Sequence, residues 1–235
     1  MGFVNDLENQ VCEYLTGDYE VSEITDIPSV DNVSFKKKAK KLNLCAYSID
    51  LRNSSDLLFK HHKQTSGKIH KAFLTVAAKV AQKYGGKIRS FQGDSILVFW
   101  PGAYKKQITD AVKAAMVTKW FLDIEFSKHF EKYEKLDFGI GIDLGEVYIL
   151  RAGISRDTNN NDLVFIGKCV NFAVAIANQA NSPYHVEISK YAYDNLLEEM
   201  IYDKDGNDMW INGTVEWNGM EHSTKITSYY SFLRR

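Results

Sequence analysis

The spacing of apolar residues changes along the chain and divides it into predicted helices and strands. Residues 3–15 place apolar side chains every three or four positions, which indicates an amphipathic helix that needs a surface to pack against. A polar stretch over residues 17–35 indicates a linker. Residues 42–51 are mostly apolar and predict a strand, and residues 68–84 return to helical spacing before a glycine pair that ends the helix.

The same reasoning divides the rest of the chain. Residues 87–92 and 95–100 are short β segments on either side of Gly93-Asp94, which is a typical hairpin signal. Residues 105–132 predict a long helix, and the apolar run of residues 135–150 predicts two strands that reverse at Gly145-Glu146. Further predicted elements are a strand at 162–167, helices at 168–180 and near 188–199, and a final pair of strands within 208–233.

The order of these elements predicts the fold class. Strand, helix, strand, strand, helix, strand is typical of an α+β fold with a ferredoxin-like βαββαβ core, to which this chain adds an N-terminal helix and C-terminal strands. We expect residues 1–41 to form the helix and linker, and residues 42–235 to form the main domain. Many unrelated functions use this core, so the function has to be argued from individual side chains.

Composition limits the choice of partners. The chain of 235 residues can bury a sizeable core, and its formal charge of −1 gives no overall attraction to nucleic acid or anionic lipid. Its three cysteines lack metal-site spacing and favour a reducing compartment, and its apolar runs are too short to cross a bilayer. We therefore expect a cytoplasmic protein without a membrane or nucleic-acid partner, in which any phosphate binding is local.

Two acidic residues, Asp50 and Asp94, are predicted to meet. Asp50 ends the first strand of the core and Asp94 lies at the tip of the central hairpin, and these places are neighbours in a ferredoxin-like core. Two carboxylates brought together repel each other unless a divalent cation such as Mg²⁺ or Mn²⁺ lies between them. Alternatively, Asp94 serves the turn and Asp50 caps the next helix. That alternative explains each residue alone, whereas the metal site explains the pair.

The segment that follows Asp50 is short and polar. Arg52, Asn53, Ser54 and Ser55 lie between the predicted strand and the next apolar position, where a helix would begin. The backbone N–H groups at the start of a helix lack intrahelical partners and bind phosphate, and small side chains let a triphosphate approach closely. The sequence therefore predicts that Asp50 binds a metal ion and that the loop of residues 52–55 after it binds phosphate groups.

Four segments of the chain resemble, in the same order, the signature segments of the class III nucleotidyl cyclase domain. They are SIDLRNSSDL, FQGDSILVFW, FGIGIDLGEVYI and VFIGKCVNFAVAIANQA. The resemblance implies a metal-dependent cyclase that forms a head-to-tail homodimer with two active sites at the interface. It also implies that Asp50, Asp94 and the carbonyl of Leu51 bind two divalent cations, Mn²⁺ or Mg²⁺, and that Asn171 orients the ribose.

Three positions depart from the pattern of this family. Members that act on adenine carry Lys at the position of Ser90 and an acid or Thr at the position of Val164, whereas members that act on guanine commonly carry Glu and Cys. Val164 can neither donate nor accept a hydrogen bond, so the usual pair that reads a purine is absent. Ala175 stands where the family has an Arg that stabilises the transition state. Either another cation supplies that charge or turnover is slow, and the candidate cations are Arg52, Arg89, Arg151 and Lys168.

The segments DLRNSS and NFAVAIANQA resemble the small bacterial pyrimidine cyclases of the Pycsar anti-phage system. That resemblance implies conversion of UTP or CTP to the 3′,5′-cyclic nucleotide as an alarm signal. We expect the base pocket to include Tyr47, Ser48, Arg89, Ser90 and Val164. Hydroxyl and cationic donors stand at these positions and no carboxylate does, which suits the carbonyl of uracil better than the amine of cytosine and favours UTP.

Three alternative functions remain open. A purine (adenylate) cyclase would use unfamiliar base contacts, and a catalytically silent nucleotide sensor would account for Ala175. An RNA-binding module on the same core would need paired aromatic residues on its exposed sheet. The near-neutral charge and the two acids at the sheet edge argue against the RNA-binding function.

Overall fold

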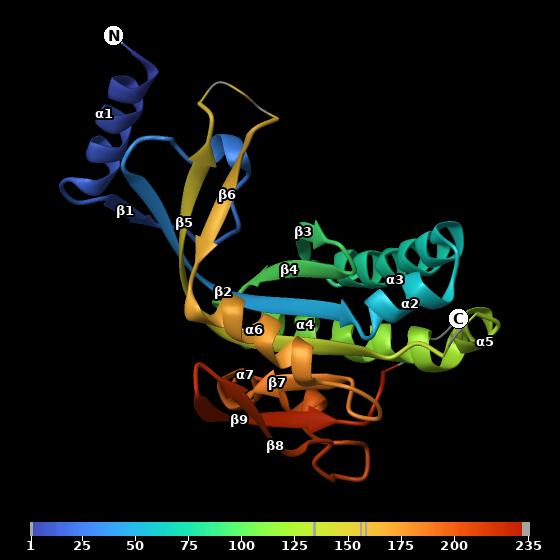
Figure 1. Ribbon diagram of the computed structural model, residues 1–235. Helices are drawn as coiled ribbons and strands as arrows, with labels where there is room; N and C mark the ends of the chain where they lie inside the picture. Colours follow the sequence, from blue (N-terminus) through green and yellow to red (C-terminus); the bar gives the residue numbers. More distant parts are fainter. Residues whose placement is uncertain (1, 134, 156, 158, 232–235) are drawn as a thin grey trace.

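The described residues form a nine-stranded mixed sheet (Figure 1). The computed structural model describes residues 2–133, 135–155, 157 and 159–231. The strand order is β3-β4-β2-β5-β7-β9-β8, with β1 paired to β2 and β6 paired to β5. The strands are β1 Glu20–Glu23, β2 Lys38–Leu51, β3 Lys87–Gln92, β4 Ser95–Pro101, β5 Phe138–Gly153, β6 Asn161–Ile166, β7 Val186–Ser189, β8 Ile211–Trp217 and β9 Met220–Thr227.

The helices cover both faces of this sheet. α3 and α4 lie together on one face, and α6 lies on the other face against β2 and β5 (Figure 1). The order β3-β4-β2-β5 with α3 and α4 on one side confirms the predicted α+β fold with a ferredoxin-like core. The helices of the described ranges are α1 Phe3–Leu15, α2 Ser54–Lys60, α3 Lys63–Lys83, α4 Lys105–Trp120, α5 Ser127–Glu131, α6 Lys168–Gln179 and α7 Lys190–Asp194, with 3-10 turns at Val30–Asn32 and Glu198–Met200.

Side chains alternate along β2, so successive residues point to opposite faces of the sheet. Tyr47 and Ile49 point into the core beneath α3 and α4, whereas Leu44 and Ala46 point into a second core beneath α6 and β6. Asp50 continues the second series at the end of the strand. Its carboxylate therefore lies on the face of α6 and outside the main core.

Two glycines bring α6 into direct contact with β5. A Cβ atom at Gly141 would lie 2.1 Å from the carbonyl oxygen of Ala173, and one at Gly139 would lie 2.1 Å from that of Ala177. Neither distance is possible for a real side chain, so only glycine fits at these positions. The backbone of α6 consequently rests on the backbone of β5, which fixes the height and direction of the helix.

The predicted reversal at Gly145-Glu146 is wrong. β5 continues through this point: it pairs with β2 over residues 138–149, with β7 over residues 140–142 and with β6 over residues 148–153. Gly145 lies opposite Leu44 in the ladder, where its lack of a side chain leaves room for Cys169 of α6. The chain reverses only after Gly153, whose φ of 109° suits glycine.

Two helical predictions need correction in detail. Residues 105–132 are helical over most of their length, but a π-helical turn at Phe121–Glu125 separates α4 from α5. The helix predicted near 188–199 begins as β7, whose residues are buried between β5 and β9, and only the short α7 follows it. The predicted C-terminal strand pair is confirmed as β8 and β9.

The N-terminal helix is confirmed, and its apolar stripe lies exposed. Phe3 and Leu15 are each 80% exposed, and no residue of α1 is buried by the described part of the chain. The segment predicted as a linker also contains a strand, because β1 pairs in parallel with the start of β2 from Glu20 opposite Lys38. Within the described ranges, no helix is long and apolar enough to cross a membrane.

Substitution of Gly141 should destabilise the protein, because the new methyl group must push α6 away from β5. We expect Gly141→Ala to lower the free energy of unfolding by about 1–3 kcal/mol, the usual cost of overpacking. Gly67→Ala is the matched control, since Gly67 lies in α3 with open space around it. That change should raise the free energy of unfolding by up to about 1 kcal/mol. Urea denaturation measures both values, and equal stabilities would contradict the direct packing of α6 on β5.

Candidate active site

Two carboxylates meet at one end of the sheet. Asp50 pairs with Ser95 across β2 and β4, and Asp94 directly precedes Ser95 in the tight turn after β3. Burial and then the negative charge of Asp94 raise the pKa of Asp50 to about 6, while the cation of Arg52 acts in the opposite direction. Asp50 and Asp94 therefore lie at the same end of the sheet, and their role as metal ligands stays a prediction.

The donors at this place suit a divalent cation. Burial is the larger cause of the raised pKa of Asp50, and a cation between the carboxylates would offset the repulsion by Asp94 that adds to it. Mg²⁺ and Mn²⁺ prefer oxygen ligands of this kind. The side chain of Leu51 is buried in the core, so this residue can offer only its main-chain oxygen. No cluster of three or more His, Cys, Asp or Glu side chains occurs among the residues described. A bound cation would therefore need ligands from main-chain oxygens, substrate or water as well.

Arg52 does not face the predicted phosphate site. Its Nη2 atom donates hydrogen bonds of 2.6 Å to the carbonyl oxygens of Ala177 and Ala180, and its Nε donates one of 3.0 Å to Ala180. Its backbone N–H donates to the carbonyl of Asp137 at 2.9 Å. The guanidinium is thus committed to the end of α6, which corrects the prediction that Arg52 binds phosphate.

The next three residues keep the predicted arrangement at the start of α2. Asn53 adopts a left-handed conformation with a φ of 54°, and its carbonyl accepts hydrogen bonds from Asp56 and Leu57. The first N–H groups of a helix have no intrahelical acceptor, so Ser54 and Ser55 present donors next to the two acids. Phosphate binding by residues 53–55 stays a prediction.

Two predicted base-pocket residues share one row of the sheet. Ser48 and Ser90 pair with Leu97 from its two sides, which places all three side chains on the face of Asp50. Ser48 is 4% exposed, and the hydroxyl of Ser90 is buried without a hydrogen-bond partner among the described residues. A buried hydroxyl without a partner is costly, and a ligand that supplies one would relieve that cost.

The other predicted base-pocket residues lie in different surroundings. Tyr47 is 0% exposed and packs in the main core 5.8 Å from Trp100, so the prediction that it contacts a base is wrong. Arg89 forms an ion pair with Asp162 of β6. Val164 is 43% exposed and lines a cavity of about 310 Å³ shared with aromatic residues of the N-terminal segment.

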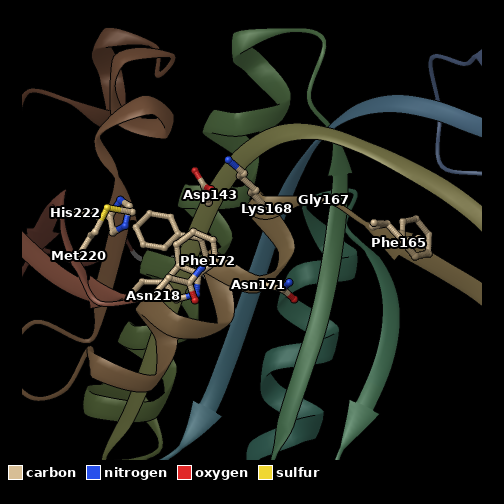
Figure 2. A pocket seen from close by; sticks show the side chains of 11 residues that line it. Asp143, Phe165, Gly167, Lys168, Asn171, Phe172, Asn218, Met220 and His222 are labelled. Carbon is tan, nitrogen blue, oxygen red and sulfur yellow. The ribbon is translucent and has the colours of Figure 1, made fainter.

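Asn171 lines an open pocket of about 780 Å³ between α6 and the β8–β9 hairpin (Figure 2). The pocket contains neither Asp50 nor Asp94. The residues labelled in Figure 2 come from β5, from β6 and α6 with the glycine between them, and from the β8–β9 hairpin. The lining residues are Asp143, Phe165, Ile166, Gly167, Lys168, Asn171, Phe172, Trp217, Asn218, Met220 and His222.

Within one chain, Asn171 is separated from Asp50 and Asp94 along the axis of α6. The end of α6 at Ala180 lies above Gly139, which pairs with Asp50 across β5 and β2. Asn171 precedes Ala180 by nine residues, which corresponds to about 13 Å along the helix axis. A single chain therefore does not bring Asn171 to the two acids.

Asp143 is a pocket residue that the sequence analysis missed. It is 8% exposed, and burial raises its pKa to about 6, although a hydrogen bond with Ser189 acts in the opposite direction. The available signal was an acid inside the otherwise apolar, glycine-rich run FGIGIDLG at the start of β5. A charge in such a run is seldom placed for stability, so it marks a candidate site residue.

The chain is similar to curated bacterial nucleotide cyclases over nearly its whole length. It is 31% identical over 227 residues to a uridylate cyclase of Burkholderia cepacia, a match that covers 94% of each chain. It is 25% identical over 230 residues to a uridylate cyclase of Xanthomonas perforans, covering 95% of each. It is also 27% identical over 108 residues to a cytidylate cyclase of Staphylococcus aureus, covering 44% of this chain and 26% of that one.

Solved structures agree on the fold. The guanylyl cyclase Cya2 matches with a TM-score of 0.68 and 19% identity over 81% of this chain and 94% of its own. The adenylyl cyclase CyaB from P. aeruginosa matches with a TM-score of 0.60 and 20% identity over 84% of this chain and 97% of its own. No family model matches the sequence. The identity with the Burkholderia relative and its near-complete coverage show that this chain belongs to the uridylate cyclase family, built on the class III nucleotidyl cyclase fold.

Proposed function

We propose that this protein converts a pyrimidine nucleoside triphosphate, UTP in preference to CTP, to the 3′,5′-cyclic nucleotide and pyrophosphate. The observation that carries the proposal is the meeting of Asp50 and Asp94 at one end of the sheet. Relatives of nearly the same length that are named uridylate cyclases support the choice of a pyrimidine. By the same resemblance, the product would act in the cytoplasm as an anti-phage signal.

The metal-binding half of the site would consist of Asp50, Asp94 and the main-chain oxygen of Leu51. Two divalent cations held there would neutralise the charge of the triphosphate and of the departing pyrophosphate. The contribution of the chain is geometric, because the pairing of β2 with β4 fixes the two carboxylates relative to each other. Their half-buried position strengthens every charge interaction compared with bulk water.

The substrate would lie between the start of α2 of one chain and Asn171 of a second copy. The N–H groups of residues 53–55 would hold phosphate oxygens, and Asn171 would orient the ribose so that its 3′-hydroxyl faces the α-phosphorus. The new bond joins O3′ to that phosphorus, the bond to the bridging oxygen of pyrophosphate breaks, and the hydroxyl proton leaves to solvent. Alignment of the reacting atoms then supplies much of the rate.

The separation of Asn171 from the acids supports a homodimer. If a second copy packs head to tail, its Asn171 pocket can face the acids of the first copy, and the same operation builds a second equivalent site. Each chain would thus give its acids to one site and its Asn171 to the other.

The base would face the row formed by Ser48, Leu97 and Ser90. Both hydroxyls can donate a hydrogen bond to a carbonyl of uracil, and the hydroxyl of Ser90 lacks a partner among the described residues. Leu97 between them offers an apolar surface for the ring edge. No carboxylate lies in this row to accept the amine of cytosine, which is the reason for preferring UTP.

Asp50→Asn and Asp94→Asn should each abolish cyclisation while the fold persists. The amide keeps the shape of the side chain but loses the charge that holds a cation, so we expect at least a loss of about 10²–10³-fold in kcat, the size seen when one electrostatic stabiliser is removed. Pyrophosphate release measures the rate. Asp110→Asn is the matched control, since Asp110 pairs with Lys106 on the surface of α4. Unchanged turnover by either site variant would refute the metal assignment.

Incubation with each of the four nucleoside triphosphates and Mn²⁺ should give cyclic UMP as the main product. We expect CTP to react more slowly because the serine row offers donors where cytosine presents an amine. Mass spectrometry of the products identifies the base. Cyclic AMP or cyclic GMP as the dominant product would contradict the pyrimidine proposal, and tight binding of UTP without pyrophosphate release would identify a silent sensor.

A further inference from the structure

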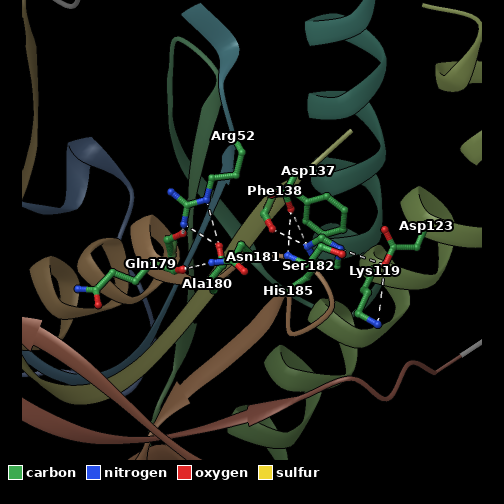
Figure 3. Close-up of polar contacts among 11 residues, drawn as sticks. Arg52, Lys119, Asp123, Asp137, Phe138, Gln179, Ala180, Asn181, Ser182 and His185 are labelled. Carbon is green, nitrogen blue, oxygen red and sulfur yellow. Dashed lines mark hydrogen bonds and ion pairs between the residues drawn. The ribbon is translucent and has the colours of Figure 1, made fainter. Parts of the chain in front are cut away.

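Arg52 joins the metal-binding end of β2 to the C-terminal end of α6 (Figure 3). It stands two positions after Asp50, and its guanidinium reaches the carbonyl oxygens of Ala177 and Ala180. These oxygens belong to the last turn of the helix, where carbonyl groups lack intrahelical donors. One side chain therefore satisfies acceptors that are more than 120 positions away in the sequence.

The contact is electrostatically matched. The last turn of α6 contains no basic residue of its own. Arg52 therefore supplies the positive charge that lies against the partial negative charge of this helix end. Gly139 makes the approach possible, because a Cβ atom there would lie 2.5 Å from the carbonyl oxygen of Ala180 and 3.0 Å from Nη2 of Arg52. Strand, guanidinium and helix end are thus packed without an intervening side chain.

A second set of hydrogen bonds holds the same corner. The backbone N–H of Arg52 donates to the carbonyl of Asp137, and the carboxylate of Asp137 accepts hydrogen bonds from the N–H groups of Phe138 and Ser182. His185 adds a 2.6 Å hydrogen bond between its Nδ1 and the carbonyl of Phe138 (Figure 3). The segment after α6 is therefore fixed to the start of β5, and Arg52 fixes the helix itself.

We propose that Arg52 is a positioning residue that couples the acid-bearing end of β2 to the helix that carries Asn171. Residues 168–179 form one continuous helix on the glycines of β5, so a displacement at its C-terminal end is transmitted along its axis to Asn171. Conversely, if the C-terminal end of α6 is displaced, Arg52 loses its hydrogen-bond acceptors, and the turn that follows Asp50 is no longer held by them.

This coupling has a particular consequence in the proposed homodimer, and here the inference rests on the proposed function. Because each chain gives its acids to one site and its Asn171 to the other, Arg52 of one chain links the two active sites of the dimer. A substitution of Arg52 should therefore affect the site to which that chain contributes only Asn171.

A mixed dimer tests the link directly. One chain carries Asp50→Asn with Asp94→Asn, and the other carries Asn171→Ala, with a different affinity tag on each for purification of the mixed species. Both parental homodimers lack one half of every site, so turnover of UTP comes from a single complete site in the mixed dimer. Arg52→Met is then introduced only into the chain with the two Asn substitutions, which supplies Asn171 to that site.

We expect this distant substitution to lower kcat by about 10-fold to 100-fold, as small misplacements of reacting groups do, with a smaller change in KM. Arg52→Lys in the same chain should recover part of the rate, since it keeps the charge but offers one donor group in place of a fork. Unchanged kcat with Arg52→Met in that chain would overturn the coupling. Absence of turnover in the mixed dimer with Arg52 intact would instead overturn the dimeric site of the proposed function.

Two further variants separate coupling from general loss of stability. Gly139→Ala keeps the cation but forces the carbonyls of α6 away from β5, so it should reproduce the effect of Arg52→Met in the same chain. Lys37→Met removes another cation that donates to a backbone carbonyl, that of Thr16 in the N-terminal segment. It should leave kcat of the mixed dimer unchanged even where it lowers the melting temperature. An equal fall in kcat for Lys37→Met would show that coupling through α6 does not explain the result.

Discussion

The candidate site depends on repulsion between two carboxylates that the backbone does not allow to separate. Asp50 is held in the ladder between β4 and β5, and Asp94 is held by the tight turn that joins β3 to β4. The backbone therefore keeps both carboxylates at the same end of the sheet, where protonation or a cation would lower their mutual repulsion. Burial and then the charge of Asp94 raise the pKa of Asp50, and the proposed metal ions would offset the repulsion between the two acids.

The register of the sheet makes this arrangement specific. A shift of one residue in β2 would turn Asp50 into the main core and bring Ile49 out toward α6. The same shift would turn Ala46 and Leu44 away from the second core beneath α6. The free energy that their apolar burial contributes there would be lost. The hydrophobic pattern of one strand thus protects the position of the acid at its end, and no polar contact is needed to enforce it.

Much of the fold could be predicted because it follows from local pattern. The strand at residues 42–51, the hairpin at Gly93-Asp94 and the helix of residues 168–180 depend on neighbouring residues and were correctly predicted. The error at Gly145 has a different origin. The sequence does not distinguish a glycine that forms a turn from a glycine that leaves room for a helix packed against the strand. Only the position of α6 shows that Gly145 is of the second kind.

The site was predicted less completely for the same reason. Asp50 and Asp94 could be paired because the topology of a known core places them, whereas the partners of Arg52 and Asp143 depend on contacts between distant segments. Arg52 seemed to belong to a phosphate loop because of its neighbours in sequence. Its side chain in fact satisfies a helix end that is distant in sequence, a choice that sequence spacing alone does not reveal.

The distribution of charge suggests why such an enzyme would divide its site between two chains. The end of the sheet that holds Asp50 and Asp94 bears two acids and would repel a triphosphate unless cations neutralised it. The pocket beside Asn171 contains both Lys168 and Asp143, so it offers little net attraction for phosphate. On the proposed function, neither half holds the nucleotide well alone, and tight binding requires cations, substrate and both chains together. Assembly then controls synthesis through electrostatics that are already present in each separate chain.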